Sequence, residues 1–327
     1  MLTTSLHASW RHVMSLSRLR DGEKVIVLGA QLGRNQYKSI ALQVAREMGG
    51  EAAYLEVENP NKLPKSAVPA LTSADLLIDL SHAHDPLIRQ LGKDGTRTLT
   101  ILEPPEILER MLPQESDKAR VESAQKCIKS ARKMRVTSAA GTDFEVELGE
   151  LKGNCQYGFA DEPGHWDQWP GAFVTTYGND RSAQGQVVID AGDIIFPQKD
   201  YVRSPIKLML EDGYIRAIEG GLDAKLLKAT LDSYNNPEVF AVSHLGWGLS
   251  RNCRWDALSF YDKQEIEGQD GRGFYGNFLF STGPNLSGGG TRRAPVHLDI
   301  PLGGCSTFLD GVPMVLDGVV IPEDQRV

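Results

Sequence analysis

The N-terminal part of the chain alternates between short apolar runs and longer segments with helical periodicity. Lys24–Ala30 is a β-branched apolar run of strand length, and in Gln36–Met48 the apolar positions recur three and four residues apart, as on one face of a helix. Further strand-like runs follow at Glu51–Val57, Leu76–Leu80 and Thr98–Leu102. Strands separated by helix-length segments predict a parallel, doubly wound α/β sheet.

The pattern changes after a predicted helix at Ser116–Lys133, for which Ser116 can serve as the N-cap. Beyond it, Arg135–Ser138 and Phe144–Leu148 predict a hairpin, and a second helical pattern follows at Asp223–Tyr234. Asp-Gly pairs, the strongest short hairpin signal, stand beside apolar or β-branched runs at Asp212-Gly213, Asp310-Gly311 and Asp317-Gly318. We therefore expect a mainly antiparallel region with one or two helices.

The length of 327 residues allows two domains. The change of pattern places their boundary near residue 112. We expect an N-terminal doubly wound α/β domain at residues 1–112 and a C-terminal, mainly antiparallel β (α+β) domain at residues 113–327.

Composition excludes several classes of protein. Acidic residues outnumber basic residues, 43 to 35, and the formal charge of −8 argues against a nucleic-acid partner. No apolar stretch approaches the roughly 18 residues of a membrane span, and Met1–Arg20 lacks the apolar core of a secretory signal. The four cysteines form no Cys-x-x-Cys pair and are typical of a reducing compartment, so we expect a cytoplasmic protein.

A short segment near the C-terminus alternates apolar and polar residues, as a half-buried strand does. Residues two apart on a strand point to the same face, so His297 and Asp299 project together while Val296, Leu298 and Ile300 face the core. An imidazole and a carboxylate on one face can bind one cation. A solvated strand face or a structural His–Asp pair would give the same pattern.

His244 is a second candidate ligand. The apolar run Val239–Val242 predicts a strand that delivers His244 to a glycine-rich turn ending at Gly248, where backbone can approach a ligand closely. A core histidine bonded to a backbone carbonyl would fit the same pattern. If His244 converges on His297 and Asp299, the three form the facial triad of non-haem Fe(II) oxygenases, which leaves three coordination positions for substrate and dioxygen.

The chain after about residue 135 resembles the aminopeptidase T-like family of metallopeptidases. Hallmarks of that family are a Pro-x-Gly-Glu-Val segment, a Glu before a glycine-rich turn, a His in a short apolar segment and a closing His-x-Asp. The chain keeps the last as His297-x-Asp299. It departs elsewhere: Ala172 stands where a metal-binding Glu would fall, His244 replaces the second Glu, and Asn277 stands where a His would be. A two-metal peptidase site needs ligands that this pattern lacks, so one metal remains.

This pattern of loss resembles one branch of the superfamily, the 2,5-dihydroxypyridine 5,6-dioxygenases of nicotinate and picolinate degradation. The match rests on the three candidate ligands and on their surroundings, which include Trp247, Arg272 and Ser281. The resemblance implies an aminopeptidase T-like fold and a single Fe(II) bound by His244, His297 and Asp299. It also implies a ring-cleaving reaction of 2,5-dihydroxypyridine with O2 that gives N-formylmaleamic acid.

Four further residues are candidates for substrate contact. His84 follows a predicted parallel strand, where open α/β sheets place functional groups. The resemblance makes His84 the base that takes a proton from the substrate hydroxyl, with His82 in reserve. Arg272, between two glycines, is a candidate anion or oxygen-stabilising donor, and Ser281 and Glu162 are candidate hydrogen-bond partners of the substrate. A surface loop position or turn capping is the alternative for His84, Arg272 and Ser281.

Two other functions stay open on the sequence alone. One is a metal-dependent aminopeptidase of the same superfamily with an unusual ligand set, and the other is an inactive relative that binds a ligand. The segment Gly288–Arg293 is expected to be a flexible loop near the metal and a candidate lid. Related folds commonly self-associate, so we expect a homo-oligomer.

Overall fold

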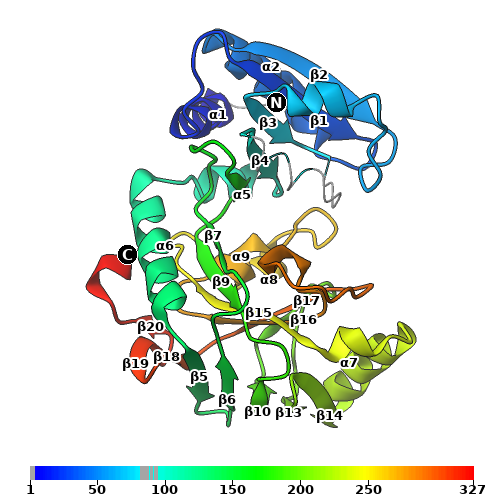
Figure 1. Cartoon of the computed structure of the whole chain (residues 1–327), viewed down its shortest axis with the longest axis vertical. Helices are drawn as coiled ribbons and strands as arrows, with labels where there is room; N and C mark the ends of the chain where they lie inside the picture. Colours follow the sequence, from blue (N-terminus) through cyan, green and yellow to red (C-terminus); the bar gives the residue numbers. More distant parts are fainter. Residues whose placement is uncertain (1–3, 82–87, 89–90, 92–94) are drawn as a thin grey trace. The chain divides into compact units, whose positions relative to one another are not determined.

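The computed structural model describes residues 4–81, 88, 91 and 95–327 (Figure 1). The chain forms two compact units. Unit 1 comprises Met1–Ser116, Gln156–Gly171 and Glu265–Glu267, and unit 2 comprises Asp117–Cys155, Ala172–Gln264 and Gly268–Val327. The units are therefore assembled from interleaved segments, whereas the sequence analysis draws one boundary after residue 112.

Unit 1 is built on a five-stranded parallel sheet, which confirms the predicted α/β fold. Its strands in sheet order are β2 (Glu51–Val57), β1 (Lys24–Ala30), β3 (Leu76–Asp79), β4 (Arg97–Ile101) and β8 (Trp166–Trp169). Its helices are α1 (Thr4–Leu16), the 3-10 turn η1 (Asn35–Tyr37), α2 (Lys38–Glu47), α3 (Val68–Thr72) and α5 (Pro105–Arg110).

Both faces of this sheet are buried, as the near-continuous apolar strands require. On one face, Leu71 of α3 packs in a cluster with Leu28 and Leu77. On the other face, Trp10 of α1 meets Trp169 of β8 edge-on, with ring centroids 5.5 Å apart. The aromatic contact joins the first segment of unit 1, Met1–Ser116, to β8, which belongs to its second segment, Gln156–Gly171.

An eight-stranded antiparallel sheet forms one layer of unit 2. Its strands in sheet order are β14 (Tyr214–Gly220), β13 (Ile206–Glu211), β10 (Gln184–Ile189), β6 (Asp143–Glu147), β5 (Lys133–Ser138), β18 (Cys305–Leu309), β19 (Val312–Leu316) and β20 (Val319–Val320). The predicted hairpins are confirmed, because β5 pairs with β6 and each Asp-Gly pair joins two antiparallel strands. Both residues of each Asp-Gly pair have positive φ, as type I′ turns require.

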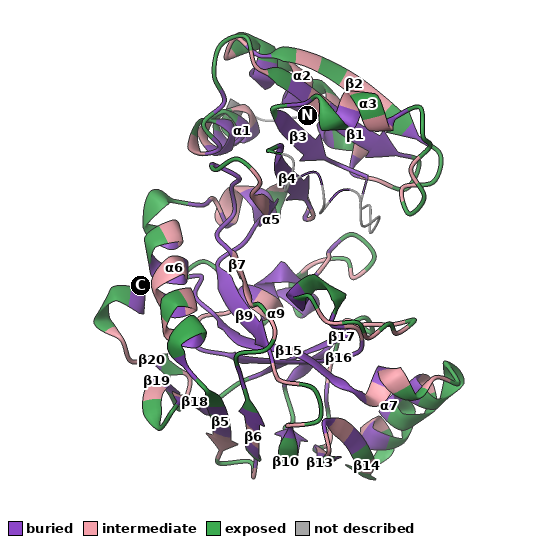
Figure 2. Cartoon of the chain, viewed as in Figure 1, coloured by how far each residue is buried: buried purple, intermediate pink, exposed green. Residues whose placement is uncertain are grey.

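A five-stranded sheet forms the second layer of unit 2, and Figure 2 shows its strands β9, β15, β16 and β17 as buried. Its strands in sheet order are β17 (Leu298–Leu302), β16 (Phe278–Thr282), β15 (Val242–Gly248), β9 (Phe173–Tyr177) and β7 (Asn154–Gln156). Phe144 of β6 contacts Phe278 and Phe280 of β16, with ring centroids 6.3 and 6.0 Å apart, so the two sheets pack face to face.

Helices and short turns complete unit 2. They are α6 (Glu115–Ser130), α7 (Leu222–Ser233), α8 (Ala257–Phe260) and α9 (Gln269–Gly273), with 3-10 turns η3 (Pro237–Phe240), η4 (Leu286–Gly288) and η5 (Glu323–Gln325) and the small hairpin β11 (Ile194–Ile195) and β12 (Asp200–Tyr201). The predicted strand at Val239–Val242 is wrong in its first part, because Asn236 caps η3 by accepting from the amide of Glu238 at 2.9 Å. Among the described residues, no helix is both long and apolar enough to cross a membrane.

Candidate metal centre

A shift of register in β15 determines the position of His244 in the strand. Ser243 and His244 together face the single residue Ser281 of β16, because the register shifts between Val242 and Leu245. Such a bulge bends a strand and redirects a side chain. The hydroxyl of Ser281 donates to the backbone carbonyl of His244 at 2.7 Å, which satisfies that carbonyl within the bulge.

The glycines after His244 belong to the strand, so the predicted glycine-rich turn is wrong. A Cβ added at Gly246 would come within 1.8 Å of the carbonyl oxygen of Val174 on β9. At Gly248 it would come within 2.3 Å of the carbonyl oxygen of Phe274. The close approach of neighbouring backbone explains both glycines.

The end of the chain supplies the other two candidate ligands. His297 directly precedes β17, and Asp299 lies within β17 opposite Ser281. Leu298 and Ile300 are buried, as the alternating pattern predicts, whereas Val296 is half-buried and precedes the strand. His244, Ser281 and Asp299 therefore lie in a row across β15, β16 and β17, with His297 beside Asp299.

The three candidate ligands converge on one point. The Nε2 atom of His244 lies 2.9 Å from Nε2 of His297 and 3.2 Å from Oδ1 of Asp299, and the remaining distance, from His297 to Asp299, is 3.1 Å. Neighbouring ligands of an octahedral ion with bonds of about 2.1 Å lie about 3.0 Å apart. The triangle therefore fits one face of such an ion. Within the part of the chain that the structure describes, it is the one group of three His, Cys, Asp or Glu residues that meets the spacing of a metal site.

The protonation states suit metal binding. Burial alone would raise the pKa of Asp299, but its interactions with the neighbouring His297, Arg272 and His244 hold it well below its usual value, so the carboxylate is ionised. Burial lowers the pKa of His244, which favours its neutral imidazole. Among the described residues, Nδ1 of His244 has no hydrogen-bond partner, so Nε2 is the ring atom engaged in the cluster. A neutral imidazole and an ionised carboxylate are the forms that coordinate a cation.

Two positions at which the resembled peptidases carry ligands hold none here. Ala172 has an apolar side chain. The side-chain amide of Asn277 is bonded to backbone groups of Gly248, Gly271 and Arg272. The ligands of a second metal are therefore missing at both positions.

The predicted substrate residues have different environments. Arg272 donates from Nε to Oδ2 of Asp299 at 2.7 Å, and Ser281 is fully buried against the His244 carbonyl. Glu162 is exposed in unit 1. His84 and its reserve His82 lie outside the described residues, and the substrate roles of all these residues stay predictions.

The segment Gly288–Arg293 is hydrogen-bonded to its surroundings, and its role as a lid stays a prediction. Arg292 donates to the carbonyl of Gly283 at 2.9 Å and to the carboxylate of Asp180 at 2.8 Å, and its amide donates to the side chain of Asn285 at 2.8 Å. These bonds link the loop to Gly283, directly after β16, and to Asp180, which lies between β9 and β10.

Sequence analysis missed a buried polar network in unit 1. The hydroxyl of Tyr157 lies 2.9 Å from Oδ1 of Asp161 and 2.8 Å from Nδ1 of His165, and Nε2 of His165 lies 3.5 Å from Oδ2 of Asp167. Burial raises the pKa of Asp167 to about 6. The only signal in the sequence is the spacing of Asp161, His165 and Asp167, which are four and two residues apart.

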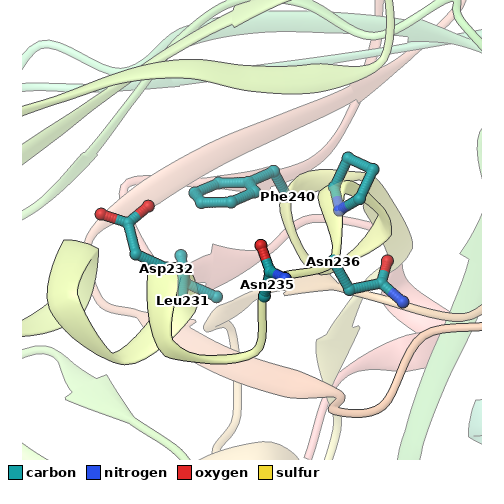
Figure 3. A pocket seen from close by; sticks show the side chains of 6 residues that line it. Leu231, Asp232, Asn235, Asn236 and Phe240 are labelled. Atoms are coloured by element: carbon teal, nitrogen blue, oxygen red, sulfur yellow. The ribbon is translucent and has the colours of Figure 1, made fainter.

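A cavity of about 230 Å³ lies at the end of α7, and none of the candidate metal ligands lines it (Figure 3). Its lining residues are Leu231, Asp232, Asn235, Asn236, Pro237 and Phe240. It contains none of the predicted site residues and no imidazole, thiol or guanidinium. It therefore adds nothing to the metal centre.

The arrangement of elements is also found in a solved structure of low sequence identity. Wild-type AmpT from Thermus thermophilus matches the chain with a TM-score of 0.66 and 12% identity, over 98% of this chain and 100% of that chain. Such a match shows the fold alone. The protein therefore has an aminopeptidase T-like fold with a His–His–Asp cluster in its second unit.

Relatives of higher sequence identity show the family to which the chain belongs within this fold class. The family model NicX, 2,5-dihydroxypyridine 5,6-dioxygenase, matches residues 5–322. The 2,5-dihydroxypyridine 5,6-dioxygenase of Pseudomonas putida KT2440 is 41% identical over 97% of this chain and 96% of its own. The solved structure of the 2,5-dihydroxypyridine dioxygenase from Pseudomonas putida KT2440 matches with a TM-score of 0.94 and 40% identity, over 98% of each chain. The chain belongs to the 2,5-dihydroxypyridine 5,6-dioxygenase family, which confirms the resemblance.

Proposed function

We propose that the chain is an Fe(II)-dependent dioxygenase that cleaves 2,5-dihydroxypyridine between C5 and C6 in nicotinate or picolinate degradation. Both atoms of dioxygen enter the product, N-formylmaleamic acid. The observation that carries the proposal is the close triangle of His244, His297 and Asp299 in a chain of this family.

The three side chains would hold the iron through Nε2 of His244, Nε2 of His297 and Oδ1 of Asp299. Two imidazoles and one carboxylate on one face are the ligand set of non-haem iron oxygenases, and they leave the opposite positions to substrate and dioxygen. When bound, Fe(II) allows triplet dioxygen to react with a closed-shell aromatic ring.

The remaining task of the chain is to position the ring and remove a proton from it. His84, or His82 in reserve, accepts the proton of a substrate hydroxyl, because a neutral imidazole titrates in the range needed. The deprotonated ring is more electron-rich and reacts more readily with an electrophile. Arg272, Ser281 and Glu162 orient the ring through hydrogen bonds.

The chain's cysteines support a cytoplasmic location. Among the described residues, Cys127, Cys155, Cys253 and Cys305 form no disulfide bond. Free cysteines are typical of reducing compartments. The homo-oligomeric state stays a prediction.

Oxygen consumption tests the proposed function. The protein is purified without oxygen, reconstituted with Fe(II) and given 2,5-dihydroxypyridine in an oxygen-electrode cell. Uptake of one O2 for each ring consumed, absent in Zn(II)-loaded protein and in His244→Ala, is the expected result. No uptake by protein with bound iron would exclude this substrate. Peptide hydrolysis by the Zn(II)-loaded protein would then favour the aminopeptidase.

A further inference from the structure

The two oxygens of Asp299 have different partners. Oδ1 lies 3.2 Å from Nε2 of His244 and 3.1 Å from Nε2 of His297. Oδ2 accepts a hydrogen bond from Nε of Arg272 at 2.7 Å. Because the guanidinium occupies Oδ2, the carboxylate directs a single oxygen at the two histidine nitrogens.

Arg272 is held in this place by a neighbouring ring. Its Cζ lies 4.3 Å from the centroid of the Phe196 ring. The amide of Phe196 donates to the backbone carbonyl of Asp299 at 2.8 Å, so the ring is tied to the same strand as the carboxylate. A guanidinium that is both stacked and hydrogen-bonded keeps little rotational freedom.

Asn277 fastens the backbone that carries Arg272. The residue is 1% exposed. Oδ1 accepts from the amide of Gly248 at 2.7 Å, and Nδ2 donates to the carbonyls of Gly271 and Arg272 at 2.6 and 3.2 Å. The acceptor and both donors of one amide are thus engaged, and they join the end of β15, the strand of His244, to α9, the helix of Arg272.

We propose that Asn277 is a positioning residue for the metal centre. By fixing α9 it keeps Arg272 on Oδ2 of Asp299, so that Asp299 binds the metal through Oδ1 alone. A carboxylate that binds through both oxygens takes two coordination positions. The arrangement therefore preserves three positions for substrate and dioxygen. The inference rests on the proposed metal site.

The alternative is a purely structural role, in which Asn277 stabilises the fold without affecting the metal. The two roles differ in what they change. Hydrogen-bond partners that orient a metal ligand alter metal affinity by about 10- to 100-fold when they are removed. Loss of a hydrogen bond elsewhere in the unit alters stability and leaves metal affinity unchanged.

Cobalt binding to the full-length protein separates these roles, because Co(II) reports its coordination through visible absorption. Asn277→Ala removes the tie to α9, and Arg272→Lys removes the Nε donor and the planar stack. Both variants keep the net charge of the site, so a change in Co(II) binding reports on the position of the Asp299 carboxylate. We expect Co(II) affinity to fall by about 10- to 100-fold in both variants, with an altered visible spectrum.

Asn179→Ala is the matched control. The Asn179 side chain also accepts from a backbone amide of unit 2, that of Glu150 at 2.9 Å, but it has no bond to α9 or β17. It should bind Co(II) like the wild type. Wild-type affinity and spectrum in Asn277→Ala, with only a lower Tm, would overturn the proposal. If Asn277→Ala does not fold, a wild-type spectrum in Arg272→Lys would overturn it equally. A wild-type chain that binds no divalent ion would instead contradict the proposed function itself.

Discussion

Asp167→Asn replaces one buried ionisable group of unit 1 with a neutral group of the same size. Asp167 lies in β8 and is fully buried. Its oxygens accept from the amides of Tyr157, Gly158 and Gln168 at 2.9, 3.2 and 2.7 Å. Burial nevertheless outweighs these bonds and the nearby His165, and raises the pKa of Asp167 from 3.8 to about 6.

The shift determines how the stability of unit 1 depends on pH. Because the folded-state pKa of Asp167 is raised, its contribution to stability is complete below the unfolded pKa of 3.8 and is lost as the pH rises through about 6. A shift of about two units corresponds to about 3 kcal/mol. The Asn side chain cannot ionise. The free energy of unfolding of Asp167→Asn, relative to the wild type, should therefore rise by about 3 kcal/mol between about pH 3 and about pH 8.

Urea unfolding at a series of pH values measures this difference, with tryptophan fluorescence as the signal, since Trp166 and Trp169 flank the site. Asp223→Asn is the control, because backbone amides of Ser204 and Arg203 lower the pKa of Asp223 and its difference should run the opposite way. The reasoning would be refuted if the free energy of unfolding of Asp167→Asn, relative to the wild type, did not change with pH or changed in the same direction as that of the control.

Three further predictions concern the metal centre. Gly246→Ala forces β15 away from β9 and displaces His244, so it should lower the free energy of unfolding by about 3 kcal/mol or more and weaken metal binding. Gly303→Ala is the control, because the nearest atom to its added Cβ would lie at 3.6 Å. The control should match the wild type in thermal melts and metal titrations. Ser281→Ala should lose about 1 kcal/mol from the bulge and weaken metal binding in the same titration, whereas a residue that only contacts substrate would raise KM alone. A chelator should lower the Tm of the wild type by removing a bound ion, and should leave the Tm of His297→Ala unchanged.

Elements with a local pattern could be predicted from the sequence. The strand limits Lys24–Ala30 and Glu51–Val57 coincide with β1 and β2, because apolar runs of strand length between turn residues carry their own signal. The Asp-Gly hairpins need only two residues to specify a turn. The shared face of His297 and Asp299 follows from the period of a strand, which is also local.

Features that depend on distant pairings could not be predicted. β8 joins the parallel sheet of unit 1 after the chain has entered unit 2, and no residue in Trp166–Trp169 signals that return. The bulge at His244 exists because Ser281 lies opposite two residues of β15. The bond between Arg272 and Asp299 joins two segments that share no sequence pattern. Such contacts arise from packing of the whole unit.

The most direct test of the proposed activity is to follow the oxygen atoms. The Fe(II)-loaded protein is given 2,5-dihydroxypyridine under heavy-isotope dioxygen in ordinary water, and the product is analysed by mass spectrometry. We predict a ring-opened product that carries two heavy oxygen atoms. A product with one heavy oxygen, or with none, would contradict a dioxygenase at this centre.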